Sequence, residues 1–143
     1  MKTQFEHKDK SPGYILWKLT TEWQRLLRVV LSEFKLTHAQ FVYLASLKWL
    51  VNTSDEVVTQ NKLSVVSGID KMVISETTQK LIDKNLITRS KSKEDKRSYS
   101  IALTSSGHRL IGAALPAIEK LDLAFFREKK QAFNKLADIV ADL

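Results

Sequence analysis

The sequence predicts a mainly α-helical (α+β) protein with the element order αααα-ββ-αα, that is, four helices, a two-stranded hairpin and two further helices. Two observations carry this prediction. Apolar residues recur every three or four positions along most of the 143 residues, which is the period of an amphipathic helix. Between residues 86 and 103, two short β-type runs flank a charged tip. A chain of this length is expected to form one domain.

The first two helices are predicted from their start signals. Ser11-Pro12 offers an N-cap followed by proline at the first helical position, and an amphipathic stripe then continues to about Lys35. The run Leu36–Phe41, LTHAQF, has the spacing of a capping box enclosed by a hydrophobic staple. We therefore expect a second helix that ends near Val51.

The next two helices have the pattern of a helix-turn-helix. Thr59 is expected to cap a short helix over Gln60–Ser67, and Asp70 to cap a longer one over Lys71–Lys84. The turn between them contains Gly68, which adopts a positive φ without strain. Asn85 is the expected left-handed stop of the longer helix.

A basic hairpin is predicted directly after this helix pair. Its strands are Leu86–Arg89 and Ser98–Leu103, and the tip between them is rich in lysine and arginine. The chain has a net charge of +7, and residues 71–110 alone contribute +5 of it, with nine basic and four acidic side chains. Such a concentration favours a polyanionic partner and indicates a winged module that binds double-stranded DNA. The candidate DNA-binding residues are Lys71, Met72, Ser75, Glu76, Gln79, Lys80, Arg89, Lys91, Lys93, Asp95, Lys96 and Arg97.

Within this set, residue chemistry suggests separate roles. Gln79 and Lys80 suit purine edges in the major groove, and Met72 suits a thymine methyl group. Arg97, at the hairpin tip, has the charge and reach to enter a minor groove, and Asp95 can orient its guanidinium. Alanine at position 97 should weaken DNA binding by about 1–3 kcal/mol.

The terminal segments are expected to form a dimerisation region. Thr104 should cap a helical region over His108–Leu143, interrupted or bent near Pro116 and again around Arg127–Gln131. These helices carry more apolar surface than the winged core can cover, and a two-fold homodimer would bury it. The predicted organisation is a flexible tail over 1–10, a helical dimerisation region over 11–35 and 105–143, and a DNA-binding lobe over 36–104.

Several function classes lack support in the sequence. There is no cysteine, and His7, His38 and His108 are too dispersed to suggest a metal site. No glycine-rich phosphate loop, nucleophile elbow or HExxH motif is present, so we expect no cofactor and no enzymatic activity. The polar N-terminus does not resemble a signal peptide, and no apolar run approaches the roughly 20 residues that span a bilayer. We expect a cytoplasmic protein without a membrane partner.

Four motifs in register resemble the signature of the MarR family of transcriptional regulators, which reads roughly LTxxQ, Lx(E/D)KGL(I/V)xR, D(R/K)R and LTxxG. The matching segments are Leu36–Gln40 (LTHAQ), Leu81–Arg89 (LIDKNLITR), Asp95–Arg97 (DKR) and Leu103–Gly107 (LTSSG). The resemblance implies an intertwined homodimer whose two winged lobes bind a palindromic operator. It also implies residues 71–80 in the major groove and Arg97 in the minor groove. Asn85 replaces the usual glycine, and Glu76 stands where a basic or neutral residue is more usual.

The resemblance also implies a small-molecule effector between the dimer helices and the DNA-binding lobe. The aromatic residues that could line such a crevice are Tyr14, Trp17, Trp23, Phe41 and Trp49. A repressor released by an effector is therefore the first hypothesis. Two alternatives stay open: a winged-helix module for protein–protein interaction, and an architectural DNA-binding regulator without a ligand.

Overall fold

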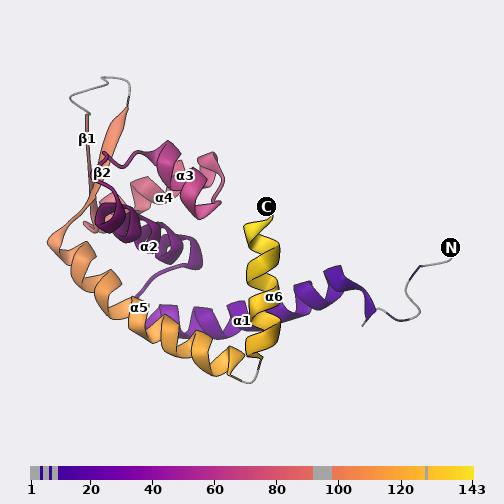
Figure 1. Ribbon diagram of the computed structural model, residues 1–143. Helices are drawn as coiled ribbons and strands as arrows, with labels where there is room; N and C mark the ends of the chain where they lie inside the picture. The colour runs from indigo at the N-terminus through magenta and orange to yellow at the C-terminus, as the bar shows by residue number, and fades with distance from the viewer. Residues whose placement is uncertain (1–3, 5–6, 8–9, 92–97, 128) are drawn as a thin grey trace.

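The computed structural model describes residues 4, 7, 10–91, 98–127 and 129–143, and within them it confirms the predicted order of elements (Figure 1). The helices and strands are α1 (Pro12–Glu33), α2 (His38–Thr53), α3 (Gln60–Ser67), α4 (Lys71–Asp83), β1 (Ile87–Lys91), β2 (Tyr99–Leu103), α5 (Ser105–Phe126) and α6 (Lys130–Ala141). The two strands form one antiparallel sheet.

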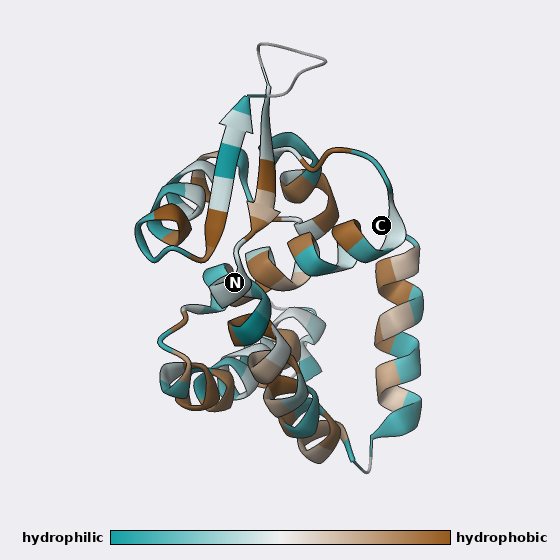
Figure 2. Ribbon diagram, turned by 90° about the vertical axis from the view of Figure 1, so that its left-hand side faces the viewer, coloured by the Kyte–Doolittle hydropathy of each residue, from teal (hydrophilic) through white to brown (hydrophobic). Residues whose placement is uncertain are grey.

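The elements are arranged in two layers. Helices α2, α3 and α4 form one unit with the hairpin, while α1 and α5 run together below it (Figure 1). Helix α6 stands apart from this body as a separate column (Figure 2). One hydrophobic core joins the two layers, because α2 packs against α1, α4 and α5. Its largest fully buried side chains are Tyr43, Leu27, Leu31, Leu44, Leu47, Leu63, Ile74, Leu81, Ile87, Ile111 and Thr78.

Most of the predicted helix caps are present. The Thr37 hydroxyl accepts from the Gln40 amide, and the Gln40 side chain accepts from the Thr37 amide, both at 3.2 Å, which completes the capping box. Thr59 and Asp70 cap α3 and α4 through their side chains. Ser11 is an exception, since its side chain makes no cap hydrogen bond and α1 begins simply at its proline.

Several boundaries differ from the prediction by one or two residues. Helix α1 ends at Glu33 rather than near Lys35, because Lys35 adopts a left-handed φ of 54°. Helix α2 continues to Thr53, two residues beyond the expected end. Strand β1 begins at Ile87 and extends to Lys91, opposite Tyr99. The exact end of a helix or strand depends on backbone hydrogen bonding, which residue patterns predict less well than the element itself.

The turn after α4 explains why β1 starts one residue late. Asn85 has a φ of 57°, as predicted, and its amide donates to the Ile82 carbonyl at 2.8 Å. The Leu86 amide donates to the Leu81 carbonyl at 3.0 Å. Leu86 therefore completes the helix stop of α4 and does not join the strand.

The start of α5 is attached to this same turn. The Thr104 hydroxyl donates to the Asn85 carbonyl at 2.8 Å and accepts from the Gly107 amide at 2.9 Å. The Thr104 amide donates to the Leu86 carbonyl at 3.1 Å. A Cβ atom on Gly107 would lie 2.0 Å from the Leu86 carbonyl oxygen, so only glycine fits there without a shift. Helix α5 then continues unbroken through Pro116, where the sequence predicts an interruption or a bend.

Candidate nucleic-acid interface

Helix α4 has a buried face and a fully exposed face, as its sequence predicts. On the inner face, Ile74, Thr78 and Leu81 are completely buried. The Thr78 hydroxyl lies 2.8 Å from the Tyr43 hydroxyl of α2 and donates to the Ile74 carbonyl at 2.8 Å. Burial chiefly raises the pKa of Tyr43, so its hydroxyl stays protonated. These contacts anchor α4 to α2.

The outer face of α4 presents the side chains proposed to contact DNA. Met72 is 72% exposed, and the other exposed members of this face are Lys71, Ser75, Glu76, Gln79 and Lys80. The Gln79 side-chain amide donates to the Asp83 carboxylate at 2.9 Å, one turn further along. Their exposure agrees with the prediction, while their contacts with DNA stay a prediction.

Cross-strand contacts hold the half of the hairpin that lies next to its tip. Ser90 faces Ser100, and their hydroxyls lie 2.8 Å apart. The Arg89 guanidinium lies over the Tyr99 ring, 5.0 Å from its centroid, which is a cation–π contact. Arg89 therefore covers the sheet surface beside Tyr99, and Lys91, which pairs with Tyr99, is exposed where β1 ends. The tip residues Lys93, Asp95, Lys96 and Arg97 lie outside the described residues.

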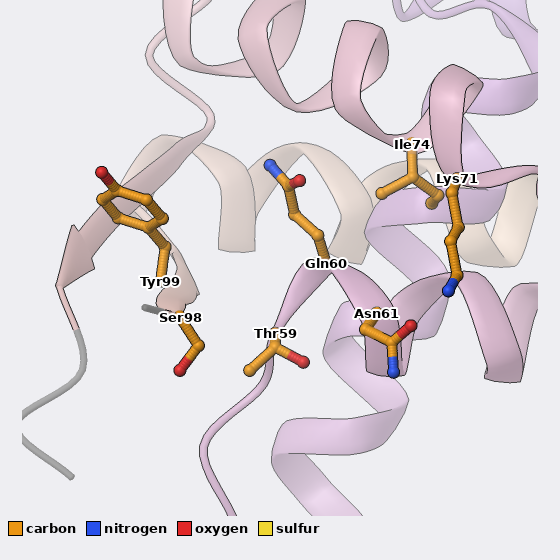
Figure 3. A pocket seen from close by; sticks show the side chains of 7 residues that line it. All are labelled: Thr59, Gln60, Asn61, Lys71, Ile74, Ser98 and Tyr99. Carbon is orange, nitrogen blue, oxygen red and sulfur yellow. The ribbon is translucent and has the colours of Figure 1, made fainter. Parts of the chain in front are cut away.

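A cleft between α3, α4 and β2 adds residues that sequence reasoning missed. It has a volume of about 320 Å³ and is lined by Thr59, Gln60, Asn61, Lys71, Ile74, Ser98 and Tyr99 (Figure 3). Of these, only Lys71 is a candidate binding residue by sequence. No local pattern marks the others, because they come from segments that meet only when the hairpin folds against α3.

The five aromatic residues proposed for an effector crevice are spread along α1 and α2, and a crevice beside the dimer helices stays a prediction. Phe41 belongs to the core, while Trp17 and Trp49 are 67% and 55% exposed. Trp23 donates through its indole to the Asp122 carboxylate of α5 at 2.8 Å, and Tyr14 lies near the exposed start of α1. In the single chain these aromatic side chains therefore occupy both core and surface positions.

A different recess lies between α1 and the start of α2. It measures about 410 Å³, and its lining residues are Gln24, Arg28, Ser32, Leu36, Thr37 and His38. The imidazole of His38 packs edge-on against Trp23, with ring centroids 5.4 Å apart. Burial, and then the positive charge of Arg28, lower the pKa of His38, while Asp122 opposes them. The recess thus has a cationic side.

Two other classes of site are absent from the part of the chain that the structure describes. It holds no group of three or more histidine, cysteine, aspartate or glutamate side chains placed to bind a metal ion. None of the described helices combines the length and the apolar character needed to cross a membrane.

A helix pair whose second helix is exposed beside a basic hairpin defines a winged helix-turn-helix protein, an architecture that binds DNA. The model of the MarR family matches residues 36–99, which cover α2 to the start of β2. The chain is also 41% identical over 137 residues to the uncharacterized HTH-type transcriptional regulator YdcH of Bacillus subtilis (strain 168), covering 96% of this chain and 92% of that protein. The chain therefore belongs to the MarR family of transcriptional regulators.

Solved structures of more distant proteins show the same fold. Bordetella bronchiseptica BpsR, whose DNA binding is regulated by 6-hydroxynicotinic acid, superposes with a TM-score of 0.84 at 20% identity, over 97% of this chain and 99% of that one. A mutant of MarR from E. coli, complexed with operator DNA, has a TM-score of 0.78 at 21% identity, over 90% and 91% of the two chains. At these identities the likeness concerns the fold alone.

Proposed function

We propose that this regulator binds a palindromic operator as a homodimer and acts as a repressor. The observation that carries the proposal is the arrangement of α4, which is anchored through Thr78 and Leu81 and presents an exposed polar face beside the hairpin. A helix held in this way fits a DNA major groove, and two copies related by a two-fold axis would meet half-sites about one helical turn apart. The MarR mutant from E. coli is complexed with operator DNA, which supports the same partner.

The proposed dimerisation region consists of α1, α5 and α6. Helix α6 has no buried residue, although Phe133, Ile139 and Val140 are apolar and at least half exposed. Leu123, near the end of α5, is 74% exposed. A monomeric globular chain rarely leaves so much apolar surface uncovered on one helix. A second copy of the chain would cover it, and sedimentation should then give a mass twice that of one chain.

We also propose that a small anionic effector occupies the recess beside Arg28. The guanidinium supplies a cation, and the hydroxyls of Ser32 and Thr37 supply polar partners. Because this recess joins α1 to the lobe that carries α4, an occupant can bias the spacing of the two recognition helices. The regulation of BpsR by 6-hydroxynicotinic acid supports this class of ligand. A thermal-shift screen of aromatic carboxylates tests it.

The test of DNA binding begins with selection of the operator from a random library of duplexes. The protein enriches the duplexes that it binds, and the enriched duplex is then titrated by fluorescence anisotropy beside a scrambled duplex at near-physiological salt. We expect tight binding to the enriched duplex alone. Gln79→Ala should weaken that binding by about 1–3 kcal/mol, the usual scale of a base-reading contact. Gln4→Ala, an exposed glutamine before α1, is the matched control and should bind as the parent does.

Two results would contradict the proposal. If no sequence is enriched, and both duplexes bind equally with a steep salt dependence, the basic surface binds DNA only non-specifically. If neither duplex binds, the winged helix serves an interaction with protein instead. A sequence-specific complex that no carboxylate perturbs would favour a ligand-independent regulator.

A further inference from the structure

The side chain of Lys84 connects the end of α4 to the corner at which α1 leads into α2. Lys84 is the C-cap residue of α4. Its ammonium group donates to the Lys35 carbonyl at 2.6 Å and to the side-chain oxygen of Gln40 at 3.1 Å. The two acceptors lie 49 and 44 positions away in the chain, so these hydrogen bonds form only when the helices are packed together.

The corner consists of residues 34–37, which alone separate α1 from α2. Within it, Lys35 adopts a φ of 54°, and the Leu36 amide donates to the Leu31 carbonyl at 3.1 Å. This is a left-handed helix stop, after which the chain changes direction. The Lys35 carbonyl accepts from the Lys84 ammonium at this stop, where the dipole of α1 also favours a positive charge.

Gln40 connects the same ammonium to α2. Its side chain is buried, and its oxygen also accepts from the Thr37 amide at 3.2 Å in the capping box. Neither of the ion pairs found among the described residues involves Lys84, and both hydrogen-bond acceptors of its ammonium are uncharged. One ammonium group therefore joins α4, the corner and the first turn of α2.

The place of this link decides what it can control. The buried face of α4 and the contact between Tyr43 and Thr78 hold α4 to α2, so these two helices move together. Helix α1 belongs to the proposed dimerisation region, and the corner is the backbone connection between that region and the lobe. Short segments at the ends of helices are where hinge motions occur. The bond from Lys84 to Lys35 restricts such a motion, because it attaches α4 to the corner itself.

We propose that Lys84 is a positioning residue that sets the separation and angle of the two recognition helices in the homodimer, and thereby the half-site spacing that the regulator accepts. This inference rests on the proposed function and deepens it. One added base pair moves a half-site by about 3.4 Å along the duplex and by about 34° around it. A lobe held at a fixed angle follows such a shift poorly, whereas a lobe released at the corner follows it more easily.

The test measures affinity as a function of half-site spacing. The enriched duplex is compared by fluorescence anisotropy with two duplexes in which one base pair is inserted or removed between the half-sites. For the parent we expect a preference of about tenfold or more for the enriched spacing, the scale of one mismatched base pair. For Lys84→Met that preference should fall by about threefold or more, the scale of one lost hydrogen bond.

Two further variants at the same position check the chemistry of the link. Lys84→Gln has a shorter, uncharged side chain and should lose the spacing preference as Lys84→Met does. Lys84→Arg keeps the positive charge and several N–H donors, so it should restore most of the preference. Lys48→Met, which replaces a half-exposed lysine on α2, is the matched control and should keep the affinity and the preference of the parent.

Two readouts separate positioning from other roles of a lysine. A variant that is merely less folded loses affinity for all three duplexes by the same factor, so its spacing preference stays that of the parent. A lysine that contacts a phosphate contributes to the slope of log affinity against log salt. We expect Lys84→Met to keep the slope of the parent, because its ammonium is bonded within the protein.

The outcomes distinguish this inference from the proposed function. If no duplex is enriched, both are overturned. If the enriched duplex binds and Gln79→Ala weakens it, but Lys84→Met keeps the full spacing preference, only the role of Lys84 is wrong. The same conclusion holds if the parent binds all three duplexes equally. A shallower salt dependence in Lys84→Met would also overturn the inference and would assign this ammonium to the DNA backbone.

Discussion

Replacing Gly107 by alanine should destabilise the protein far more than the same change at Gly112, five residues later in α5. At position 107 the new methyl group would lie 2.0 Å from the Leu86 carbonyl oxygen and 3.2 Å from the Leu103 side chain. The oxygen belongs to the backbone and cannot rotate away, so the turn after α4 must separate from α5. That separation lengthens the hydrogen bond from the Thr104 amide to the same carbonyl.

The size of the destabilisation follows from the steric clash and from the lengthened hydrogen bond. Overpacking of a well-packed site costs about 1–3 kcal/mol, and a weakened buried hydrogen bond costs about 1 kcal/mol more. Against this, alanine gains at most about 1 kcal/mol of helix propensity over glycine. We expect Gly107→Ala to lower the free energy of unfolding by about 2–3 kcal/mol. At Gly112 no atom lies within 4 Å of the new methyl group, so Gly112→Ala should be neutral or stabilising by up to about 1 kcal/mol.

Urea denaturation followed by circular dichroism measures both variants, at one protein concentration because a dimer unfolds in a concentration-dependent manner. The m-value should stay the same, so that a shift in midpoint reports stability. If the two variants differ by less than about 0.5 kcal/mol, within the range of ordinary surface substitutions, the contact between α5 and the turn after α4 does not constrain the fold.

Two further predictions concern buried polar groups and use the same denaturation assay. Thr78→Val should lower the free energy of unfolding by about 1–3 kcal/mol, because it leaves the buried Tyr43 hydroxyl unpaired. Tyr43→Phe should lower it by only about 0.5–1.5 kcal/mol, because the Thr78 hydroxyl keeps its backbone acceptor. Equal losses would contradict this assignment of donors. Burial chiefly, and then the charge of Arg28, lower the pKa of His38 in the folded chain, so the unfolded state takes up a proton first as the pH falls. The stability that the neutral imidazole contributes should be fully present above the pKa of the unfolded state, about 6.5. It should decline as the pH falls through the lower pKa of the folded state. His38→Gln should flatten the dependence of the free energy of unfolding on pH over that interval. An unchanged pH dependence would show that protonation of this imidazole is not coupled to folding.

Local signals predicted the DNA-binding lobe well. The capping box at Thr37, the turn at Gly68 and the left-handed stop at Asn85 are each specified within about five residues. The amphipathic pattern of α4 correctly separated its buried face from its exposed one. The same reasoning missed the cleft that α3, α4 and β2 line together.

The amino-acid sequence by itself determined which segments of this regulator are helical, where most of those helices start, and which side of α4 is available to a partner. Capping, turn and periodicity signals act between neighbouring residues, so they can be read without knowing the packing. The tertiary structure decided which distant residues come together: Gly107 meets Leu86, Trp23 meets Asp122, and Lys71, Asn61 and Tyr99 line one cleft. It also left α6 without a single buried side chain. These contacts depend on how helices and hairpin pack in three dimensions, and no local pattern in the sequence encodes that packing.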